Sequence, residues 1–277
     1  MTASGSDQAG AGGGGRADRA GTQAVLVERV DATATVTLNR PEVRNAINGE
    51  LRRQLRRAMV ALEADADIAV VVLTGADPAF CAGLDLREVG RGNPDVIGDQ
   101  TSGSTRPWAP MSKPVIGAVN GPAITGGFEL ALNCDLLIAS ERAAFADTHA
   151  RVGVMPGWGL TPLLVDAVGV RRAREISLSG NFVSADLAER WGLVNRVVAH
   201  DELLPTVYAL AADIAGNDQA GVRRMLATYA EQTDDRLATA WRLEGEASAA
   251  FRGEIEFRPA EVEARRQAIL ERGRSQL

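Results

Sequence analysis

The 277-residue sequence lacks an excess of positive charge. Its net charge is -6 and its pI is about 5.2, whereas a nucleic-acid-binding protein needs a basic face for phosphate contacts. Nucleic acid is therefore not an expected partner. Lysine is the scarcest charged residue, because Lys113 is the only one, and we attribute the preference for arginine to genomic composition.

Cysteine and histidine are also rare. Cys81 and Cys134 form no disulfide framework, which favours reduced thiols and a cytoplasmic location. His149 and His200 belong to no metal-ligand motif, so no metal cofactor is expected. The sequence also lacks GxSxG and a strand followed by GxGxxG, which argues against a hydrolase nucleophile elbow and a dinucleotide site.

Long apolar runs are missing as well. None reaches the roughly 18 residues of a membrane span, so no membrane partner is expected. Residues 1–21 are rich in glycine, alanine and serine and contain no apolar segment of a signal peptide, which predicts a disordered tail.

The rest of the chain alternates short apolar strands with helices up to about residue 199 and is helical in pattern from His200 onward. This predicts an α/β core over residues 22–199 and a helical region over residues 200–277. The expected strands are "AVLVERV", "ATVTLN", "IAVVVLTG", "KPVIGAVNG", "DLLIAS" and "LVNRVV". Residues 90–110, rich in Gly, Pro and Ser, are expected to be irregular or mobile.

One expected helix follows "LNRPEVRNAIN" and has Asn48 as its N-cap. Its apolar positions recur every three or four residues, and four arginines fall on its other faces. A solvated polar face is the favoured interpretation of these arginines, with a phosphate-binding patch as the alternative. The apolar positions are Ile47, Leu51, Leu55, Met59 and Leu62, and the arginines are Arg52, Arg53, Arg56 and Arg57.

Glu129 in "TGGFEL" is the only charged residue between Gly121 and Cys134. It lies in the first turn of an expected helix, whose N-terminus favours the ionised form, while apolar neighbours favour the neutral form. Such a carboxylate suits acid–base catalysis. Gly126 and Gly127 leave backbone N–H groups accessible at the helix start, as an oxyanion hole requires. A buried glutamate paired with an arginine is the alternative interpretation.

The stretch "FCAGLDL" provides a second glycine before a helix start. Gly83 precedes a helix expected near Asp85, so the N–H of Leu84 could also face a site. Alone the pattern is weak, because Gly-x-Asp is a common helix entry.

Five ordered blocks between residues 23 and 200 resemble the crotonase superfamily, also called enoyl-CoA hydratase/isomerase. They are "LNRPEVRNAIN", "LTGADPAFCAGLDL", "KPVIGAVNGPAITGGFELALNCDLLIAS", "FADTHARVGVMPGWG" and "SLSGNFVSADLAERWGLVNRVV". The resemblance implies a spiral of ββα units with a C-terminal helical trimerisation region, and a homotrimer or a dimer of trimers. It implies an acyl-CoA substrate and no cofactor beyond the coenzyme A of that substrate.

The resemblance also implies roles for individual residues. The amides of Leu84 and Gly126 would hold the thioester oxygen as an enolate forms, and Glu129 would be the acid–base residue. Arg44 is a candidate for a CoA phosphate, with a solvated side chain as the alternative. The residues expected to contact substrate or CoA are Arg44, Ala46, Ala82, Gly83, Asp85, Leu86 and Gly127.

Two departures from the family pattern stand out. Hydratases use a second glutamate at the position that holds His149 here. This histidine could orient water or shuttle a proton, or it could pack without a catalytic role. Asp147 is close in sequence but is not taken as the missing carboxylate. Relatives also use a lysine or an aromatic residue in the C-terminal region to contact CoA, and an arginine would have to replace it here.

Hydration of a 2-enoyl-CoA is the default activity that the resemblance implies. Double-bond isomerisation is a rival, because a single glutamate can move a proton between carbons, and decarboxylation or hydrolysis of acyl-CoA remains open. A non-catalytic acyl-CoA-binding protein is a further alternative, motivated by His149. A serine peptidase is not favoured, because "ITGGFE" has no serine. Acyl chain length is expected to depend on the loop at 90–110, on Trp108 and on Trp158.

Overall fold

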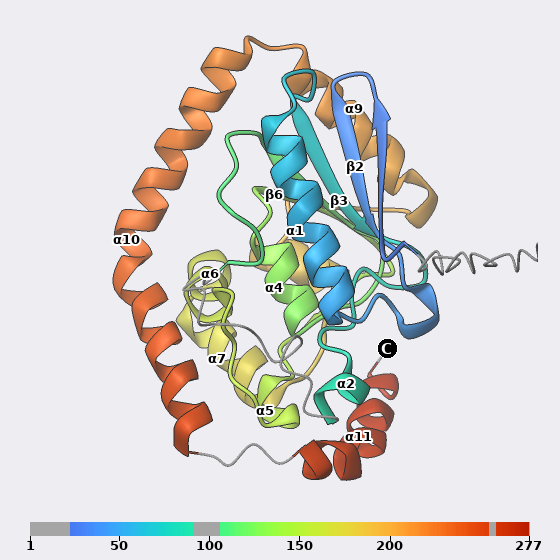
Figure 1. The fold of residues 1–277 in the computed structure, drawn as a ribbon, viewed down its shortest axis with the longest axis vertical. Helices are drawn as coiled ribbons and strands as arrows, with labels where there is room; N and C mark the ends of the chain where they lie inside the picture. Colours follow the sequence, from blue (N-terminus) through green and yellow to red (C-terminus); the bar gives the residue numbers. More distant parts are fainter. Residues whose placement is uncertain (1–22, 91–105, 255–258, 277) are drawn as a thin grey trace, which may run out of the picture.

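The computed structural model describes residues 23–90, 106–254 and 259–276. The predicted tail at residues 1–21 and most of the irregular segment predicted at 90–110 lie outside these ranges. Within them, the chain forms a mixed α/β body with a helical C-terminal region (Figure 1). No helix among the described residues is both long and apolar enough to cross a membrane.

Six strands form the main sheet, in the order β1-β2-β3-β4-β6-β9. The β1 strand pairs antiparallel with β2 around the turn at Asp31, and the remaining pairs are parallel. The six strands predicted from apolar runs are confirmed to within a few residues. Their bounds are β1 Val25–Val30, β2 Thr33–Leu38, β3 Val70–Gly75, β4 Val115–Val119, β6 Leu136–Ser140 and β9 Arg196–Val198.

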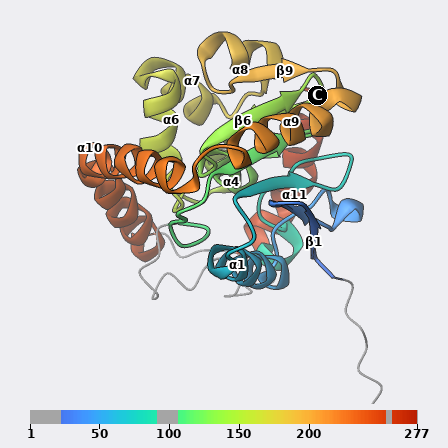
Figure 2. The ribbon, with the colours of Figure 1, turned by 90° about the horizontal axis from the view of Figure 1, so that it is seen from above.

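Both faces of this sheet are covered, which explains the uninterrupted apolar sequence of β3. Val71 and Leu73 point into the larger core, and Val70 and Val72 point into a second core on the opposite face. Helix α9 (Leu203–Ala215) supplies the helical side of that second core and contacts β2, β3, β4 and β6. Helix α1 (Gly49–Ala64) packs against β1 and β2 on the face of the sheet that forms the larger core (Figures 1 and 2).

The N-terminus of α1 is capped as predicted, because Asn48 Oδ1 accepts from Leu51 N at 2.8 Å. Two details of the prediction are wrong. Ile47 precedes the helix and forms a bridge with Leu84. Arg52 is only 8% exposed and its guanidinium stacks on the ring of Trp158, so the side chain is not part of a solvated face. Cation–π stacking explains how an arginine is accommodated there.

A second sheet of three short strands, β5-β7-β8, lies beside the main one. The sequence patterns did not predict these strands, because runs of two or three residues show no periodicity. They are β5 Ala123–Ile124, β7 Ala144–Ala146 and β8 Val183–Ser184. Helices around them are α2 Leu86–Gly90, α4 Gly126–Leu132, α5 His149–Val152, α6 Leu160–Val168, α7 Val170–Ser179 and α8 Ala185–Trp191, with 3-10 turns η1 Pro41–Val43 and η3 His200–Glu202.

Two more helices complete the C-terminal region. Helix α10 (Gln219–Glu254) has 36 residues and runs along one side of the body, where it contacts α6. Helix α11 (Pro259–Arg274) packs against α2 and α5 at the lower edge in Figure 1. The helical pattern predicted from His200 onward is therefore confirmed for the described residues.

The single lysine is a structural residue. Lys113 is 1% exposed, and its Nζ donates to the carbonyl oxygens of Leu62, at 2.5 Å, and of Asp65. These carbonyls belong to the C-terminal end of α1, where a positive charge is favourable.

Replacement of Lys113 by methionine is expected to lower the free energy of unfolding by about 2 kcal/mol, because it leaves buried carbonyls without a donor. Urea unfolding measures the effect. Arg57→Met on the exposed face of α1 serves as the matched control and is expected to change little. Equal midpoints for both variants would contradict a capping role of Lys113.

Candidate active site

The start of helix α4 has an unusual backbone. Thr125, just before it, has φ 53° and ψ -112°, a conformation that β-branched residues rarely adopt. Its N–H donates to Ala146 O, and its hydroxyl lies 2.5 Å from that of Thr148. Strain of this kind is retained where the surrounding structure holds it, and such positions cluster at functional sites.

The N–H groups of Gly126 and Leu84 lie close together at this turn. A Cβ built on Gly126 would lie 3.9 Å from Leu84 N. Gly83 has φ +85°, and its carbonyl oxygen accepts from Ile47 N. Asp85 N donates to Ile47 O. The N–H of Leu84, which lies between these two bonds, takes no part in the pairing with Ile47. Among the described residues, neither the Leu84 nor the Gly126 N–H has an acceptor. Two adjacent free donors can stabilise negative charge on one oxygen atom.

Gly127 has a packing role at the same turn. A Cβ at this position would lie 2.1 Å from Cys81 O and 2.7 Å from Cys81 Cβ. Only glycine therefore lets α4 approach the strand-like segment at Cys81 this closely.

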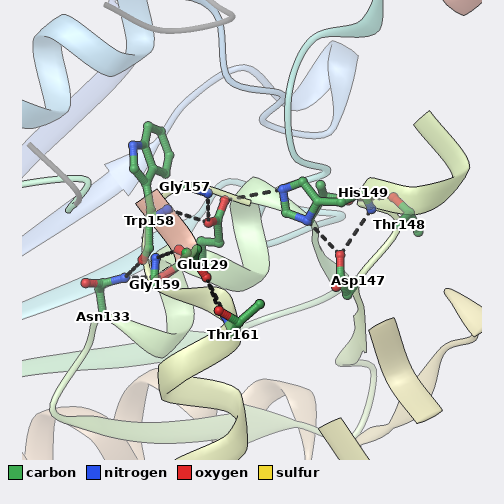
Figure 3. Close-up of polar contacts among 11 residues, drawn as sticks. Glu129, Asn133, Asp147, Thr148, His149, Gly157, Trp158, Gly159 and Thr161 are labelled. Carbon is green, nitrogen blue, oxygen red and sulfur yellow. Dashed lines mark hydrogen bonds and ion pairs between the residues drawn. The ribbon is translucent and has the colours of Figure 1, made fainter. Parts of the chain in front are cut away.

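Glu129 is 4% exposed and is held by backbone donors. Its Oε1 accepts from Trp158 N at 2.7 Å and from Gly157 N at 3.1 Å (Figure 3). Its Oε2 faces His149 Nε2 at 3.6 Å. Among the described residues none of its partners is an arginine, so the arginine-paired alternative is wrong.

His149 links two carboxylates. The imidazole is 5% exposed, and its Nδ1 donates to Asp147 Oδ1 at 2.6 Å, while the other ring nitrogen faces Glu129 (Figure 3). The backbone N–H of His149 also donates to Asp147 Oδ1. Asp147 thus fixes the ring orientation, a contact that a separation of two residues in the sequence did not reveal.

The three groups are electrostatically coupled. Burial disfavours the imidazolium, but the hydrogen bond to Asp147 and the charge of Glu129 outweigh it and raise the pKa of His149 to about 10. Burial likewise disfavours ionised Asp147, but its bonds to His149 keep the Asp147 pKa below the usual value. At neutral pH His149 is therefore protonated, with Asp147 on one side of the ring and Glu129 on the other.

A cavity of about 290 Å³ opens between the start of α4, η1 and helix α11. It reaches Leu84, Thr125 and Thr148. Gly83, Gly126, Gly127, Glu129 and His149 are not among its lining residues. Of the residues predicted to contact substrate or CoA, those that line it are Arg44, Ala46, Ala82, Asp85 and Leu86. Asp85 is mostly buried and forms an ion pair with Arg40 at 3.2 Å.

Two residues that hold Glu129 could not be identified from the sequence. Gly157 and Trp158 donate to it through backbone N–H groups, which do not depend on the type of side chain. Trp158 O also accepts from Asn133 Nδ2 at 2.8 Å (Figure 3). Trp158 and Trp108 are both buried in the larger core, and neither lines the cavity.

A buried glutamate faces His149 in this site, and two free backbone donors lie at the turn before the helix that carries the glutamate. Groups of these kinds can exchange protons and stabilise negative charge on an oxygen atom. Among the described residues, no three His, Cys, Asp or Glu side chains form a metal-binding group.

Comparisons with known proteins define the family of this enzyme. The family model for enoyl-CoA hydratase/isomerase matches residues 28–273. The chain is 38% identical over 221 residues to a probable peroxisomal enoyl-CoA hydratase of Arabidopsis thaliana, covering 79% of this chain and 82% of the relative. The protein belongs to the enoyl-CoA hydratase/isomerase family and is an acyl-CoA enzyme of the hydratase/isomerase type.

Solved structures agree with this assignment and confirm the predicted fold class. An enoyl-CoA hydratase from Mycobacterium tuberculosis H37Rv matches with a TM-score of 0.77 and 49% identity, over 83% of this chain and 98% of that one. A monofunctional enoyl-CoA isomerase from M. smegmatis matches with a TM-score of 0.65 and 37% identity, over 77% and 95% of the chains.

Proposed function

We propose that this enzyme hydrates 2-enoyl-CoA thioesters, with Glu129 and His149 as the acid–base pair. The observation that carries the proposal is the 3.6 Å contact between Glu129 Oε2 and His149 Nε2. Two glutamates act together on water in hydratases of this family, and neighbouring carboxyl groups hold one proton between them. A carboxylate and an imidazolium also hold one proton between them, so His149 can replace the second glutamate without changing the proton count.

In the proposed reaction, Glu129 Oε2 accepts a proton from water as the water oxygen bonds to the β-carbon of the substrate. The electrons of the double bond move to the thioester oxygen, where the N–H groups of Leu84 and Gly126 stabilise the enolate. His149 Nε2 then donates its proton to the α-carbon. Transfer of the proton on Glu129 to His149 restores the starting state, and the sum is the addition of one water.

The hydrogen bonds to Glu129 support this assignment. Oε1 is occupied by the N–H groups of Gly157 and Trp158, so Oε2 is the oxygen free to exchange a proton. The bond to Asp147 holds His149 in one orientation and leaves Nε2 directed toward Glu129. Both groups are therefore positioned before substrate binds, which is the geometric requirement for proton transfer.

The same proposal places CoA in the cavity. Arginine side chains from distant parts of the sequence line it and suit the phosphates of CoA. Arg266 and Arg274 on α11 are candidates to replace the C-terminal lysine of relatives. The arginines that line the cavity are Arg44, Arg87, Arg151, Arg266 and Arg274.

Isomerisation of a 3-enoyl-CoA is the second candidate. It is favoured by the raised pKa of His149, because a group protonated up to about pH 10 is a weak proton donor. Glu129 alone would then carry the proton between carbons.

The homotrimer, or dimer of trimers, and the cytoplasmic location stay predictions, and one relative is named for the peroxisome.

Crotonyl-CoA and a 3-enoyl-CoA such as 3-hexenoyl-CoA separate the two candidates. Hydration is expected to remove the absorbance of the conjugated thioester of crotonyl-CoA, with a kcat/KM of at least about 10⁴ M⁻¹s⁻¹, and to form 3-hydroxybutyryl-CoA. Conversion of 3-hexenoyl-CoA to the 2-enoyl isomer, without any hydroxyacyl product, would instead establish isomerisation. Binding of both substrates without turnover of either would contradict both proposals.

A further inference from the structure

One face of the long helix α10 is buried against the body of the protein. Trp241 and Glu244 on this face are 8% and 4% exposed. Leu237 and Ser248 continue the face one turn away on either side, at 8% and 1%. The spacing of three and four residues places all four side chains on one side of the helix. A carboxylate in the middle of such a face needs a specific reason.

Glu244 bonds to the start of helix α6. Its Oε1 accepts from Gly159 N at 2.7 Å, and its Oε2 accepts from Thr161 N and Thr161 Oγ1, both at 2.6 Å. Gly159 is the N-cap of α6 and has no side chain with which to cap it. A residue 85 positions further along the chain therefore supplies the cap.

The same short loop holds Glu129. Three consecutive backbone N–H groups, those of Gly157, Trp158 and Gly159, are divided between two buried carboxylates. The first two donate to Glu129, and the third donates to Glu244. Figure 3 shows Gly157, Trp158, Gly159 and Thr161 following one another beside Glu129. A displacement of the loop would therefore change the bonds to both carboxylates.

The Gly157–Gly159 loop also packs against α10, through Trp241. A Cβ on Gly159 would lie 1.8 Å from the Trp241 ring, so the indole is in close contact with this backbone. Trp241 and Glu244 are three residues apart on α10, so the same face of the helix both packs against Gly159 and bonds to it.

The ionised form of Glu244 is disfavoured at this position. Burial raises the pKa of Glu244, the charge of Glu129 raises it further, and the N–H and O–H bonds only partly compensate. Among the described residues no cation pairs with it.

We propose that Glu244 is a positioning residue that keeps the Gly157–Gly159 loop in place. The loop in turn holds Oε1 of Glu129, which directs Oε2 for proton transfer. This rests on the proposed function, in which Glu129 exchanges a proton with substrate. Glu244 touches neither substrate nor the reacting atoms in this scheme and acts only through the loop. Activity is therefore expected to depend on residues of α10 that lie outside the cavity.

Glu244→Gln tests the proposal, because its amide keeps one acceptor oxygen but presents an NH₂ group to Thr161. It is expected to lower kcat about 30-fold, in line with the effect of a displaced catalytic group, while KM and the Kd of saturated butyryl-CoA change less than threefold. Thr161→Val is expected to give a smaller loss of kcat in the same direction, and Thr161→Ser to restore kcat. Glu246→Gln, on the exposed side of the same helix, is the matched control.

The second measurement does not depend on turnover. Hydrogen exchange by mass spectrometry on a peptide that spans residues 153–164 is expected to be at least tenfold faster in Glu244→Gln and unchanged in Glu246→Gln. Unchanged exchange would overturn the proposal whether or not the enzyme hydrates enoyl-CoA. Faster exchange with kcat within twofold of the parent, or with kcat and butyryl-CoA binding lost in parallel, would also overturn it. Inactivity of the unaltered protein together with faster exchange would contradict the proposed function and leave the loop contact supported.

Discussion

Glu129→Gln is expected to lower kcat for crotonyl-CoA by about 10³-fold, within the range for loss of a general acid–base group. Glutamine still presents an oxygen to the N–H groups of Gly157 and Trp158. Its NH₂ group cannot accept a proton from water and faces the N–H of His149 instead. The Kd of saturated butyryl-CoA is expected to change less than threefold, because Glu129 does not line the cavity.

Steady-state kinetics and calorimetric binding measure both quantities on one preparation. Glu141→Gln, at an exposed position of the same chain, controls for loss of a carboxylate in general. Retention of more than a tenth of the parent activity by Glu129→Gln would remove Glu129 from the mechanism. Equal loss of binding and of kcat would indicate a collapsed site rather than a missing base.

His149→Gln is expected to have the largest effect on stability. The imidazolium lies between Asp147 and Glu129, so its removal leaves two buried carboxylates without a cation. Breaking one side of a buried ion pair costs about 3–5 kcal/mol. Urea unfolding at pH 7 measures the loss, and kcat is expected to fall together with stability. His200→Gln is the matched control, since that ring is partly exposed and contacts Asp77 and Ser140.

The pH dependence of stability gives a sharper test of the same group. Because the folded pKa of His149, about 10, exceeds its unfolded value of about 6.5, its contribution is complete below pH 6.5. It is lost as pH rises toward 10. The lowered pKa of Asp147 acts in the opposite sense, with a contribution present above about pH 4 and lost in acid.

The unfolding free energy of the parent protein is therefore expected to fall by a few kcal/mol between pH 6.5 and pH 10. In His149→Gln this alkaline decline is expected to be much smaller, and His200→Gln is expected to behave like the parent. Parallel declines in the parent and in His149→Gln would show that His149 does not carry the proton assigned to it.

The strands were predictable because burial on both faces imposes a local pattern. Val70 to Leu73 form an uninterrupted apolar run, and the two cores that receive their side chains explain why the run cannot alternate with polar residues. Arg52 shows the limit of such patterns. Helical spacing separates it from the apolar stripe, yet the ring of Trp158, more than 100 positions away, provides a buried partner.

The sequence by itself determined the family through five ordered blocks and the fold class through alternating strands and helices. It also singled out Glu129, because glycines at a helix start and an isolated carboxylate are local features that specific chemistry requires. Only the tertiary structure decided what surrounds Glu129. Asp147 orients His149, and the N–H groups of Gly157 and Trp158 hold one carboxylate oxygen. Glu244 reaches the same loop from α10. Backbone donors are common to nearly all residue types, and long-range contacts have no fixed spacing, so neither leaves a pattern in one sequence.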